Sequence, residues 1–478
     1  MNKHLSLVFV LLFIGLGSNV YADSAEDLIN RSGIRGGLIV HVGCGDGRLT
    51  AALHVNDRYL VQELDTSKEN VDAARKHIRS ASLYGTVSVR QFDGKNLPYV
   101  DNLVNLVVIS DSKLRIPESE IKRVLAPRGV AIIGDAKIVK PWPEEIDQWS
   151  HRLNGADNNA VANDSVVDTP RRLKWACGPL WSRSHEHTSS ISVLVSAEGR
   201  LFYVVDEGVA GRPDLPESWM LIARDAFNGV VLWKKPLVEW GQKLWRKSSL
   251  RATPLSIQDR LVAGGGKLFM IRGKAGKVVA YDAATGVLLN DYEGTDGTTA
   301  MRYSDGVLVV QDKGLTAFDA ESGLKIWDKE GVSRIPAAVS NGQVYYVDGT
   351  DVVCVGLREG KEQWTRTGIQ KIKSLLIDEN YLALFGNSFH MLQAGSGETI
   401  WTGKLEGGFK RSTPFIANGR LWSGWQGYDL KTGNKVSLYA DDVYSLGHHT
   451  RCYPPKATEN YLITANRGAE FVSLTGKP

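Results

Sequence analysis

The sequence predicts two folded modules, an α/β Rossmann-like domain with a parallel sheet followed by an all-β propeller of about seven or eight blades. Strands and helices alternate around a glycine-rich turn in the first part of the chain, and a short turn motif recurs about every 37 residues in the rest. The 478 residues exceed the roughly 100–200 of one domain, so two or three units are expected. The predicted segments are a signal peptide (1–22), the α/β domain (23–138), a connector (139–189) and the propeller (190–478).

The composition is that of a soluble globular protein, with 43% hydrophobic and 23% charged residues. The 49 glycines and 13 tryptophans favour a turn-rich β architecture. The formal net charge is only +4, and lysine and arginine are scattered among aspartate and glutamate rather than gathered in runs. This distribution excludes the basic stripe that nucleic-acid-binding proteins carry, so no nucleic-acid partner is expected.

The N-terminus has the features of a secretory signal. Lys3 precedes the apolar run Leu5–Leu16, and Val20 and Ala22 place small residues at the two cleavage-determining positions. We therefore expect export to the periplasm or cell envelope, with a mature chain that begins at Asp23; an uncleaved anchor is the alternative. No later segment is apolar over the about 20 residues that a membrane-spanning helix needs.

A buried strand and a glycine-rich turn open the α/β module. The apolar run Gly36–Val42 is typical of a strand in a parallel sheet, and Arg48–Leu53 has a helix-forming composition. Gly43, Gly45 and Gly47 lie between them, at the strand-to-helix turn. A backbone without Cβ atoms can approach a ligand closely there and can present free amide groups at the helix N-terminus.

Acidic residues follow the next two predicted strands. The strand Tyr59–Asp65 ends on a carboxylate 20 positions beyond Gly45, where it could accept hydrogen bonds from ribose hydroxyls. The third strand, Val87–Phe92, leads into Asp93. The remaining elements are helices over Ala25–Ser32 and Asn70–Ser80 and strands over Leu103–Ile109 and Val130–Ile133. This alternation predicts a doubly wound parallel sheet.

The ordered set resembles the class I S-adenosylmethionine-dependent methyltransferases over about residues 25–138. The resemblance implies S-adenosylmethionine as a cofactor. It also implies binding roles for five residues: the methionine part borders Gly43, Gly45 and Gly47, the ribose meets Asp65, and the adenine meets Asp93.

The chain departs from that family in two places. His41 stands where the family usually has an acidic residue, two positions before the first glycine. Few residues follow the fifth predicted strand, which leaves little room for a substrate cover, and export would separate the domain from cytoplasmic S-adenosylmethionine. Active methyl transfer and a retained fold with only a binding or structural role are therefore both open.

A turn motif with an aspartate, a glycine and a following tryptophan recurs through the second module. Its fullest copies are Ala223–Gly229 with Trp233, Ala280–Gly286, and Ala317–Gly323 with Trp327. Weaker copies end at Gly360, Gly397, Gly433 and Gly476. From Gly286 to Gly433 the glycines are spaced by 37, 37, 37 and 36 residues. A period near 40 with several short strands in each unit predicts propeller blades, with each tryptophan flat against the neighbouring blade.

The repeat resembles that of pyrroloquinoline-quinone (PQQ) dehydrogenases and of the related cofactor-free propellers of outer-membrane assembly factors, over about residues 190–476. The resemblance implies that a PQQ site would be covered by a disulfide between adjacent cysteines, with calcium beside it. Cys44, Cys177, Cys354 and Cys452 include no adjacent pair, so PQQ is not supported by a visible site. We interpret the tryptophans as blade-docking core.

Two histidine clusters flank the propeller. One holds His185 and His187, and the other holds His448, His449 and Cys452. If the ring closes with an N-terminal strand such as Arg172–Ala176, the first and last blades adjoin and the clusters could bind zinc or copper. The alternatives are an incomplete ring, and loop residues that bind no metal.

These features predict an exported protein whose propeller is a ligand- or protein-binding scaffold and whose α/β domain is of the nucleotide-binding type. Envelope proteins or polysaccharide are the expected partners. Two enzymatic alternatives are an active S-adenosylmethionine-dependent methyltransferase and a PQQ- or metal-dependent oxidoreductase on the propeller, with the metal unknown.

Overall fold

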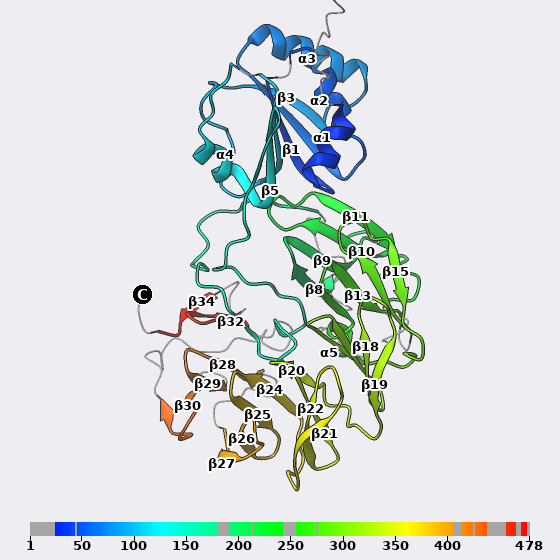
Figure 1. Cartoon of the computed structure of the whole chain (residues 1–478), viewed down its shortest axis with the longest axis vertical. Coiled ribbons are helices and arrows are strands. Elements are labelled where there is room, and N and C mark those ends of the chain that lie inside the picture. The colour runs from blue at the N-terminus through cyan, green and yellow to red at the C-terminus, as the bar shows by residue number, and fades with distance from the viewer. Residues whose placement is uncertain are drawn as a thin grey trace, which may run out of the picture.

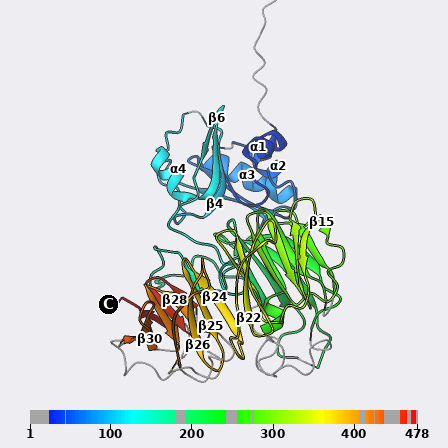
Figure 2. The same cartoon turned by 60° about the horizontal axis from the view of Figure 1, so that its bottom comes forward.

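The computed structural model describes residues 24–475, apart from 44, 112, 179–190, 213, 242–254, 274–275, 406–412, 424–425, 437–455 and 465–469. An α/β domain forms the N-terminal module, and the rest of the chain forms a ring of β-sheets (Figure 1). The α/β domain lies over the first blades of the ring, drawn in green, and away from the last ones (Figure 2).

The α/β domain holds one six-stranded sheet with helices packed on it. Its elements are α1 (Ala25–Ser32), β1 (Gly37–Val42), α2 (Arg48–Ala52), β2 (Tyr59–Asp65), α3 (Lys68–Ser80), β3 (Val87–Gln91), β4 (Val104–Ile109), α4 (Glu118–Val124), β5 (Leu125–Ile133) and β6 (Ala136–Val139). The strand order is β3-β2-β1-β4-β5-β6, parallel except for β6, which runs antiparallel to β5. This order confirms the predicted Rossmann-like fold.

Local sequence explains these elements. β1 is buried at all six positions because both faces of a parallel sheet are covered, so it is one apolar run rather than an alternation. α3 turns an apolar stripe that includes Val71 and Ile78 toward the sheet. It begins at Lys68, two residues before the predicted start, because the Ser67 hydroxyl accepts a hydrogen bond from the backbone N–H of Asn70.

The propeller has seven blades of four strands each, which settles the predicted range of seven or eight. Blade 1 holds β8 (Ile191–Ala197), β9 (Arg200–Asp206), β10 (Trp219–Asp225) and β11 (Val231–Pro236). α5 (Leu255–Gln258) precedes blade 2, which holds β12 (Leu261–Gly264), β13 (Lys267–Ile271), β14 (Val278–Asp282) and β15 (Leu288–Asp291). Blade 3 holds β16 (Ala300–Ser304), β17 (Val307–Gln311), β18 (Leu315–Asp319) and β19 (Lys325–Lys329). Blade 4 holds β20 (Ala338–Ser340), β21 (Gln343–Asp348), β22 (Asp351–Gly356) and β23 (Glu362–Arg366).

The last three blades repeat this plan, with one strand borrowed from the connector. Blade 5 holds β24 (Ser374–Asp378), β25 (Tyr381–Phe385), β26 (Phe389–Gln393) and β27 (Thr399–Gly403). Blade 6 holds β28 (Phe415–Ala417), β29 (Arg420–Ser423), β30 (Gln426–Asp429) and β31 (Lys435–Val436). Blade 7 combines β7 (Val161–Ala162) with β32 (Lys456–Thr458), β33 (Tyr461–Thr464) and β34 (Glu470–Ser473).

Blades dock on one another through the tryptophan of the turn motif. The Trp233 indole N–H donates to the Ala283 carbonyl at 3.0 Å, and its ring lies so close to Gly286 that a Cβ there would come within 2.7 Å of it. Gly286 also has a φ of 72°, so this position requires glycine on two counts. Three further pairs repeat the geometry: Trp327 on Gly360, Trp364 on Gly397 and Trp401 on Gly433.

The connector contributes to blade 7. β7 pairs in parallel with β32 on the axial side of that blade, so the connector strand of the ring is Val161–Ala162 and not the predicted Arg172–Ala176. The predicted segment forms no strand. However, Trp175 lies against Gly229 of blade 1 and donates to the backbone of that turn at 3.0 Å, as the repeat tryptophans do in their own turns. The connector therefore supplies both a strand and a docking tryptophan.

Residues 149–160, which we call the axial segment, lie where the inner strands of all seven blades meet. One strand of each blade donates a single backbone N–H to this segment, always from its last-but-one residue, at 2.7–3.0 Å. From blade 1 to blade 7 the donors are Ser196, Ala263, Tyr303, Val339, Ile377, Ile416 and Ala457. The acceptors in the same order are the carbonyls of Trp149 and Ser150, His151 Nε2, the carbonyls of Ala156 and Asp157, Asn159 Oδ1 and the carbonyl of Ala160.

Two side chains of the axial segment, Asn159 and His151, accept hydrogen bonds in place of backbone carbonyl groups. Asn159 Oδ1 accepts from the Ile416 N–H at 3.0 Å, and Asn159 Nδ2 donates to the Ile416 carbonyl at 2.9 Å, so its amide pairs with blade 6 as a strand would. His151 Nε2 accepts from Tyr303, which requires a neutral ring, and burial lowers the pKa of His151 well below its ordinary value. The proton is then on Nδ1, 2.7 Å from the Ser150 hydroxyl.

The α/β domain docks on blade 1 through the amino ends of its strands. Asn105 Nδ2 donates to Asp225 Oδ2 at 2.7 Å, and Asn105 Oδ1 accepts from Asn228 Nδ2, also at 2.7 Å. A Cβ at Gly36 would come within 2.8 Å of Leu232, so the two backbones approach closely here. Because parallel strands begin at this edge, their carboxyl ends point away from the propeller.

We expect Asn159→Ala to destabilise the propeller by about 3 kcal/mol, because the buried N–H and carbonyl of Ile416 would lose their partners. Urea or thermal unfolding of the whole chain measures the change. Asn163→Ala is the matched control, since Asn163 is exposed just beyond the axial segment, and it should stay within about 0.5 kcal/mol of the parent protein. Equal stability of the two variants would contradict the role given to the Asn159 amide.

We expect Asn105→Asp to weaken the docking of the two modules. The variant places a second carboxylate against Asp225, whose pKa is already raised by burial. Differential scanning calorimetry should show melting of the α/β domain about 5–10 °C lower and separated from that of the propeller. In Asn56→Asp, the new carboxylate can still accept from the Arg58 N–H as Asn56 does, so this control should melt as the parent does.

Candidate nucleotide site

The residues predicted to bind a nucleotide gather at the carboxyl edge of the parallel sheet. β1 ends beside β2, and the Gly43 N–H donates to the Leu64 carbonyl at 2.9 Å, which places the glycine turn next to Asp65. β3 ends beside β2 in turn, and Asp93 follows it by two residues. The structure therefore brings Gly43, Gly45, Gly47, Asp65 and Asp93 to one edge, although Cys44 lies outside the described residues.

The three glycines differ in what surrounds them. All have a φ between 64° and 79°, a backbone conformation that favours glycine. A Cβ at Gly43 would come within 2.4 Å of Asp111, and one at Gly47 within 2.7 Å of Ala74, so both positions are closed by packing. Nothing lies within 4 Å of a Cβ built on Gly45. Gly45 is therefore the point of the turn at which another molecule can approach the backbone.

Asp65 is buried at the end of β2. Its Oδ1 accepts from the Ser67 N–H at 2.8 Å and its Oδ2 from Asn70 Nδ2 at 3.1 Å. These hydrogen bonds hold the carboxylate at the strand end, the position at which an acidic side chain can accept from a ribose hydroxyl in this kind of sheet.

Asp93 is exposed and organises its own turn. Its Oδ1 accepts from the backbone N–H groups of Lys95 and Asn96, both at 2.8 Å, and its Oδ2 from the Asn96 side chain at 2.9 Å. These hydrogen bonds lower the pKa of Asp93 to about 2, so the carboxylate is charged at any ordinary pH.

A buried histidine and a buried glutamate lie side by side beneath this edge. His41 on β1 is opposite Glu63 on β2. Burial lowers the pKa of His41 to about 4, although the negative charge of Asp65 acts in the opposite direction. Burial raises the pKa of Glu63 to about 8, and the charge of Asp65 adds to this increase. Both side chains are therefore uncharged at neutral pH.

The histidine fastens three elements of the domain. Its Nδ1 is 2.7 Å from the Thr50 hydroxyl on α2, and its Nε2 is 2.8 Å from the Ser110 hydroxyl after β4. His41 is thus a structural residue beneath the turn. Where the family that this domain resembles has an acidic residue, this chain has an uncharged side chain whose two ring nitrogens are both hydrogen-bonded within the domain.

Sequence reasoning missed one acidic residue of this edge. Asp111 follows β4 by two positions and packs against Gly43, and its Oδ1 accepts from the Lys113 N–H at 2.8 Å. The signal was available, since a polar residue that directly follows a buried parallel strand lies at the carboxyl edge of the sheet.

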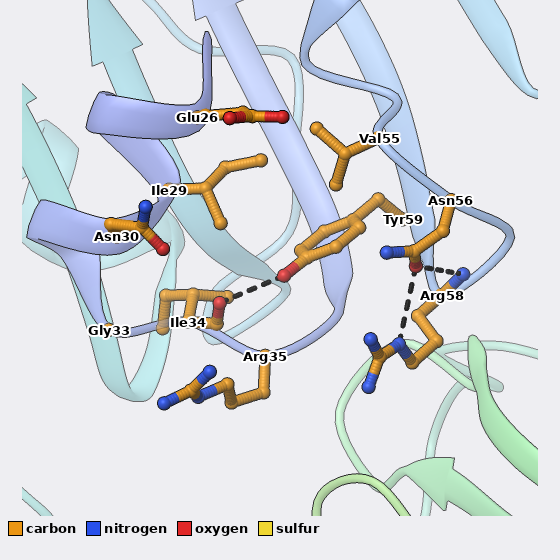
Figure 3. Close-up of a pocket in the computed structure, with 10 residues that line it drawn as sticks. All are labelled: Glu26, Ile29, Asn30, Gly33, Ile34, Arg35, Val55, Asn56, Arg58 and Tyr59. Atoms are coloured by element: carbon orange, nitrogen blue, oxygen red, sulfur yellow. Dashed lines mark hydrogen bonds between the residues drawn. The ribbon is translucent and has the colours of Figure 1, made fainter.

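A cavity of about 450 Å³ lies in the same domain but at the opposite edge. Figure 3 shows it between α1 and the start of β2, with the Tyr59 hydroxyl donating to the Ile34 carbonyl at 2.9 Å and Arg58 on the side nearest the propeller ribbon. Six residues of strand separate this edge from the glycine turn, which is roughly 20 Å at about 3.3 Å per residue. The described part of the propeller therefore does not cover the candidate nucleotide site.

The predicted metal ligands His185, His187, His448, His449 and Cys452 all lie outside the described residues. Within the part of the chain that the structure describes, no three histidine, cysteine, aspartate or glutamate side chains are placed to hold a metal ion. Among the cysteines of that part, Cys177 and Cys354 are free thiols. No helix of the described ranges is long and apolar enough to cross a membrane.

Comparisons with known proteins match the two modules separately. A family model described as a methyltransferase domain matches residues 39–129, and one described as outer membrane protein assembly factor BamB matches residues 238–367. Methyltransferase GfsG of Streptomyces halstedii is 30% identical over 116 residues, which are 23% of this chain and 42% of that protein. Demethylmenaquinone methyltransferase of Lactobacillus johnsonii is 34% identical over 106 residues, 20% of this chain and 43% of that protein.

The chain thus spans less than half the length of these two curated relatives. Among solved structures, BamB from Moraxella catarrhalis matches 51% of this chain and 83% of its own, at 15% identity and a TM-score of 0.31.

We expect Glu63→Gln to stabilise the protein increasingly as the pH rises from about 5 to 9. The folded-state pKa of about 8 lies above that of an unfolded glutamate, so the unfolded chain loses its proton first and wild-type stability falls across this interval. At about 1.4 kcal/mol for each pH unit, the gain should reach roughly 4 kcal/mol above pH 8 and vanish near pH 4. Thermal unfolding at several pH values measures it. Glu144→Gln, at an exposed position, should show no such trend, and a gain independent of pH would contradict the assignment.

Proposed function

We propose that this chain, which joins a methyltransferase domain of the S-adenosylmethionine-dependent kind to a seven-bladed propeller like that of BamB, is an exported scaffold whose first module binds S-adenosylmethionine. The observation that carries the proposal is the open approach to Gly45 beside the carboxylate of Asp65 at the carboxyl edge of the sheet. Backbone amide groups and an acidic side chain at that edge are what an adenosyl ligand requires.

Each part of the ligand has a residue to meet it. The methionine part would lie along the glycine turn, where Gly45 leaves space for it. The ribose hydroxyls would donate to the Asp65 carboxylate at the end of β2, and the adenine would lie near the turn that Asp93 organises. These three residues come from the loops after β1, β2 and β3, which meet at one edge.

The propeller supports the scaffold part of the proposal. Seven blades locked to one axial segment give a rigid ring whose outer turns are free to hold envelope proteins or polysaccharide. The N-terminal residues 1–22 favour export to the periplasm or cell envelope, as their sequence indicates.

Active methyl transfer is the second candidate, because the nucleotide edge points away from the propeller and is open to an acceptor brought by another molecule. It predicts formation of S-adenosylhomocysteine when the protein is incubated with S-adenosylmethionine and an envelope extract. A scaffold that only binds the nucleotide forms none. Oxidation by PQQ or a metal on the propeller is a further alternative that rests on sequence alone.

Calorimetric titration of the mature protein with S-adenosylmethionine and S-adenosylhomocysteine tests the proposal. We expect micromolar binding that weakens by about tenfold to a hundredfold in Asp65→Ala, since a hydrogen bond to a charged group contributes about 1.5–3 kcal/mol. Asp57→Ala removes an exposed carboxylate at the other edge and should bind as the parent does.

Several outcomes redirect the interpretation. Because Asp65 also accepts from Ser67 and Asn70, Asp65→Asn, which keeps the size of the side chain, checks that a loss is not a folding defect. Absence of binding by the parent protein up to millimolar ligand would overturn the nucleotide proposal. Binding of PQQ with calcium, titrated in parallel, would move the function to the propeller.

A further inference from the structure

The propeller contains a cavity of about 440 Å³ on its axis. Its floor is formed by Arg152, Leu153 and Asn158 of the axial segment. Its walls are the beginnings of inner strands and the residues just before them, among them Ala300 and Leu375. The axial segment accepts its hydrogen bonds near the other ends of the same strands, so the cavity is the part of the axial channel that this segment leaves open.

The cavity is lined with surplus positive charge. Among the described residues that line it, the basic side chains are Arg152, Arg302, Arg334 and Lys373, and the acidic side chain is Asp259. Four positive charges against one negative charge leave a net charge of +3 around a space closed by low-dielectric walls. Such a lining focuses the field and attracts anions.

Two of the four cationic side chains, Arg302 and Arg152, form hydrogen bonds or ion pairs with other residues of the propeller. Arg302 is 5% exposed, and its Nε and Nη2 donate to Asn158 Oδ1 at 2.9 and 2.5 Å. Arg152 Nη1 is 3.2 Å from one oxygen of Asp259, and Arg302 Nη1 is 3.5 Å from the other. One carboxylate is thus shared by two guanidinium groups, which leaves the floor of the cavity positive.

The other two cations are at the rim. Arg334 and Lys373 are exposed, and within the described residues neither side chain has a hydrogen bond or an ion pair. Leu153 on the floor and Pro336, Leu375 and Pro414 on the walls provide apolar surface. A site with charged groups at two levels and apolar surface suits a ligand with anionic groups on a small organic frame.

We propose that this axial cavity binds a small polyanion, an organic molecule with two or more phosphate or carboxylate groups, through Arg334, Lys373 and Arg152. Guanidinium groups pair with either oxyanion in a bidentate way, and the volume falls within the range of about 300–1,000 Å³ that small-molecule sites occupy. The site is separate from the nucleotide edge and does not depend on the function proposed for it.

The test uses the whole mature chain at low ionic strength and two probes, pyrophosphate for the phosphate class and citrate for the carboxylate class. We expect calorimetry to show saturable binding of at least one probe, weakened by added salt, while uncharged glucose gives no signal. Binding of pyrophosphate alone assigns the phosphate class, and binding of citrate alone assigns the carboxylate class.

The double variant Arg334→Gln, Lys373→Gln should weaken that binding by about tenfold or more, since each lost charge-assisted bond contributes about 1.5–3 kcal/mol. The matched control Lys361→Gln, Arg366→Gln removes the same charges from exposed positions on the outer side of blade 4 and should stay within about twofold of the parent. If the double variant melts abnormally, Lys373→Gln alone is used in the same titration.

The proposal is overturned if neither probe binds at concentrations up to about 5 mM, well above typical small-molecule affinities. It is also overturned if the rim variant binds as tightly as the control. Titration of the same preparations with S-adenosylmethionine keeps the two sites distinct, because the rim variant should bind that nucleotide as the parent does. If the rim variant loses anion binding and still binds the nucleotide, the loss therefore concerns only the axial cavity.

Discussion

The propeller depends on hydrogen bonds that seven backbone N–H groups donate to one segment of the connector. The innermost strand of a blade has an open edge, and a buried N–H without a partner costs roughly 1–3 kcal/mol. In this ring the last-but-one residue of a strand in every blade, from Ser196 to Ala457, donates to the axial segment. A segment of twelve residues thus satisfies donors that are up to 261 positions apart in sequence.

The rest of the architecture follows from that arrangement. The axial segment continues into β7, which pairs with β32 of blade 7, and Trp175 further along supplies the tryptophan that docks on blade 1. Arg152 and Asn158 of the same segment form the floor of the basic cavity. One stretch of chain therefore fixes the ring and shapes its axial binding space, so a change in it would affect stability and ligand binding together.

The α/β module is organised by a different constraint. Its amino edge is occupied by blade 1 through Asn105, Asp225 and Asn228, which leaves the carboxyl edge as its free surface. Beneath that edge, burial keeps His41 and Glu63 uncharged, so the turn is held by hydrogen bonds and packing rather than by an ion pair. Asp65 and Asp93 lie at the ends of β2 and β3 at that edge, where the proposed adenosyl ligand would meet them.

The sequence by itself determined what is encoded locally. The alternation of apolar runs with helix-forming stretches predicts the parallel sheet. Gly43 directly follows the first apolar run and Asp65 ends the second, so the sequence predicts that both lie where strands end. The spacing of 37 residues likewise predicts the blades and a tryptophan packed flat against the neighbouring blade, because the motif repeats once in each structural unit. The structure adds that Trp233, Trp327, Trp364 and Trp401 each pack on a glycine of the next blade.

Only the tertiary structure decided how the ring is closed and filled. β7 has two residues and no alternation to reveal it, whereas Arg172–Ala176 has the composition of a strand but forms none. The blade residues that pair with Asn159 and His151 are more than 150 positions away, and the charges of the axial cavity come from the axial segment and from blades 2 to 5. Hydrogen bonds and charge clusters between such distant residues leave no periodic trace in the sequence, because each depends on where the folded blades bring them.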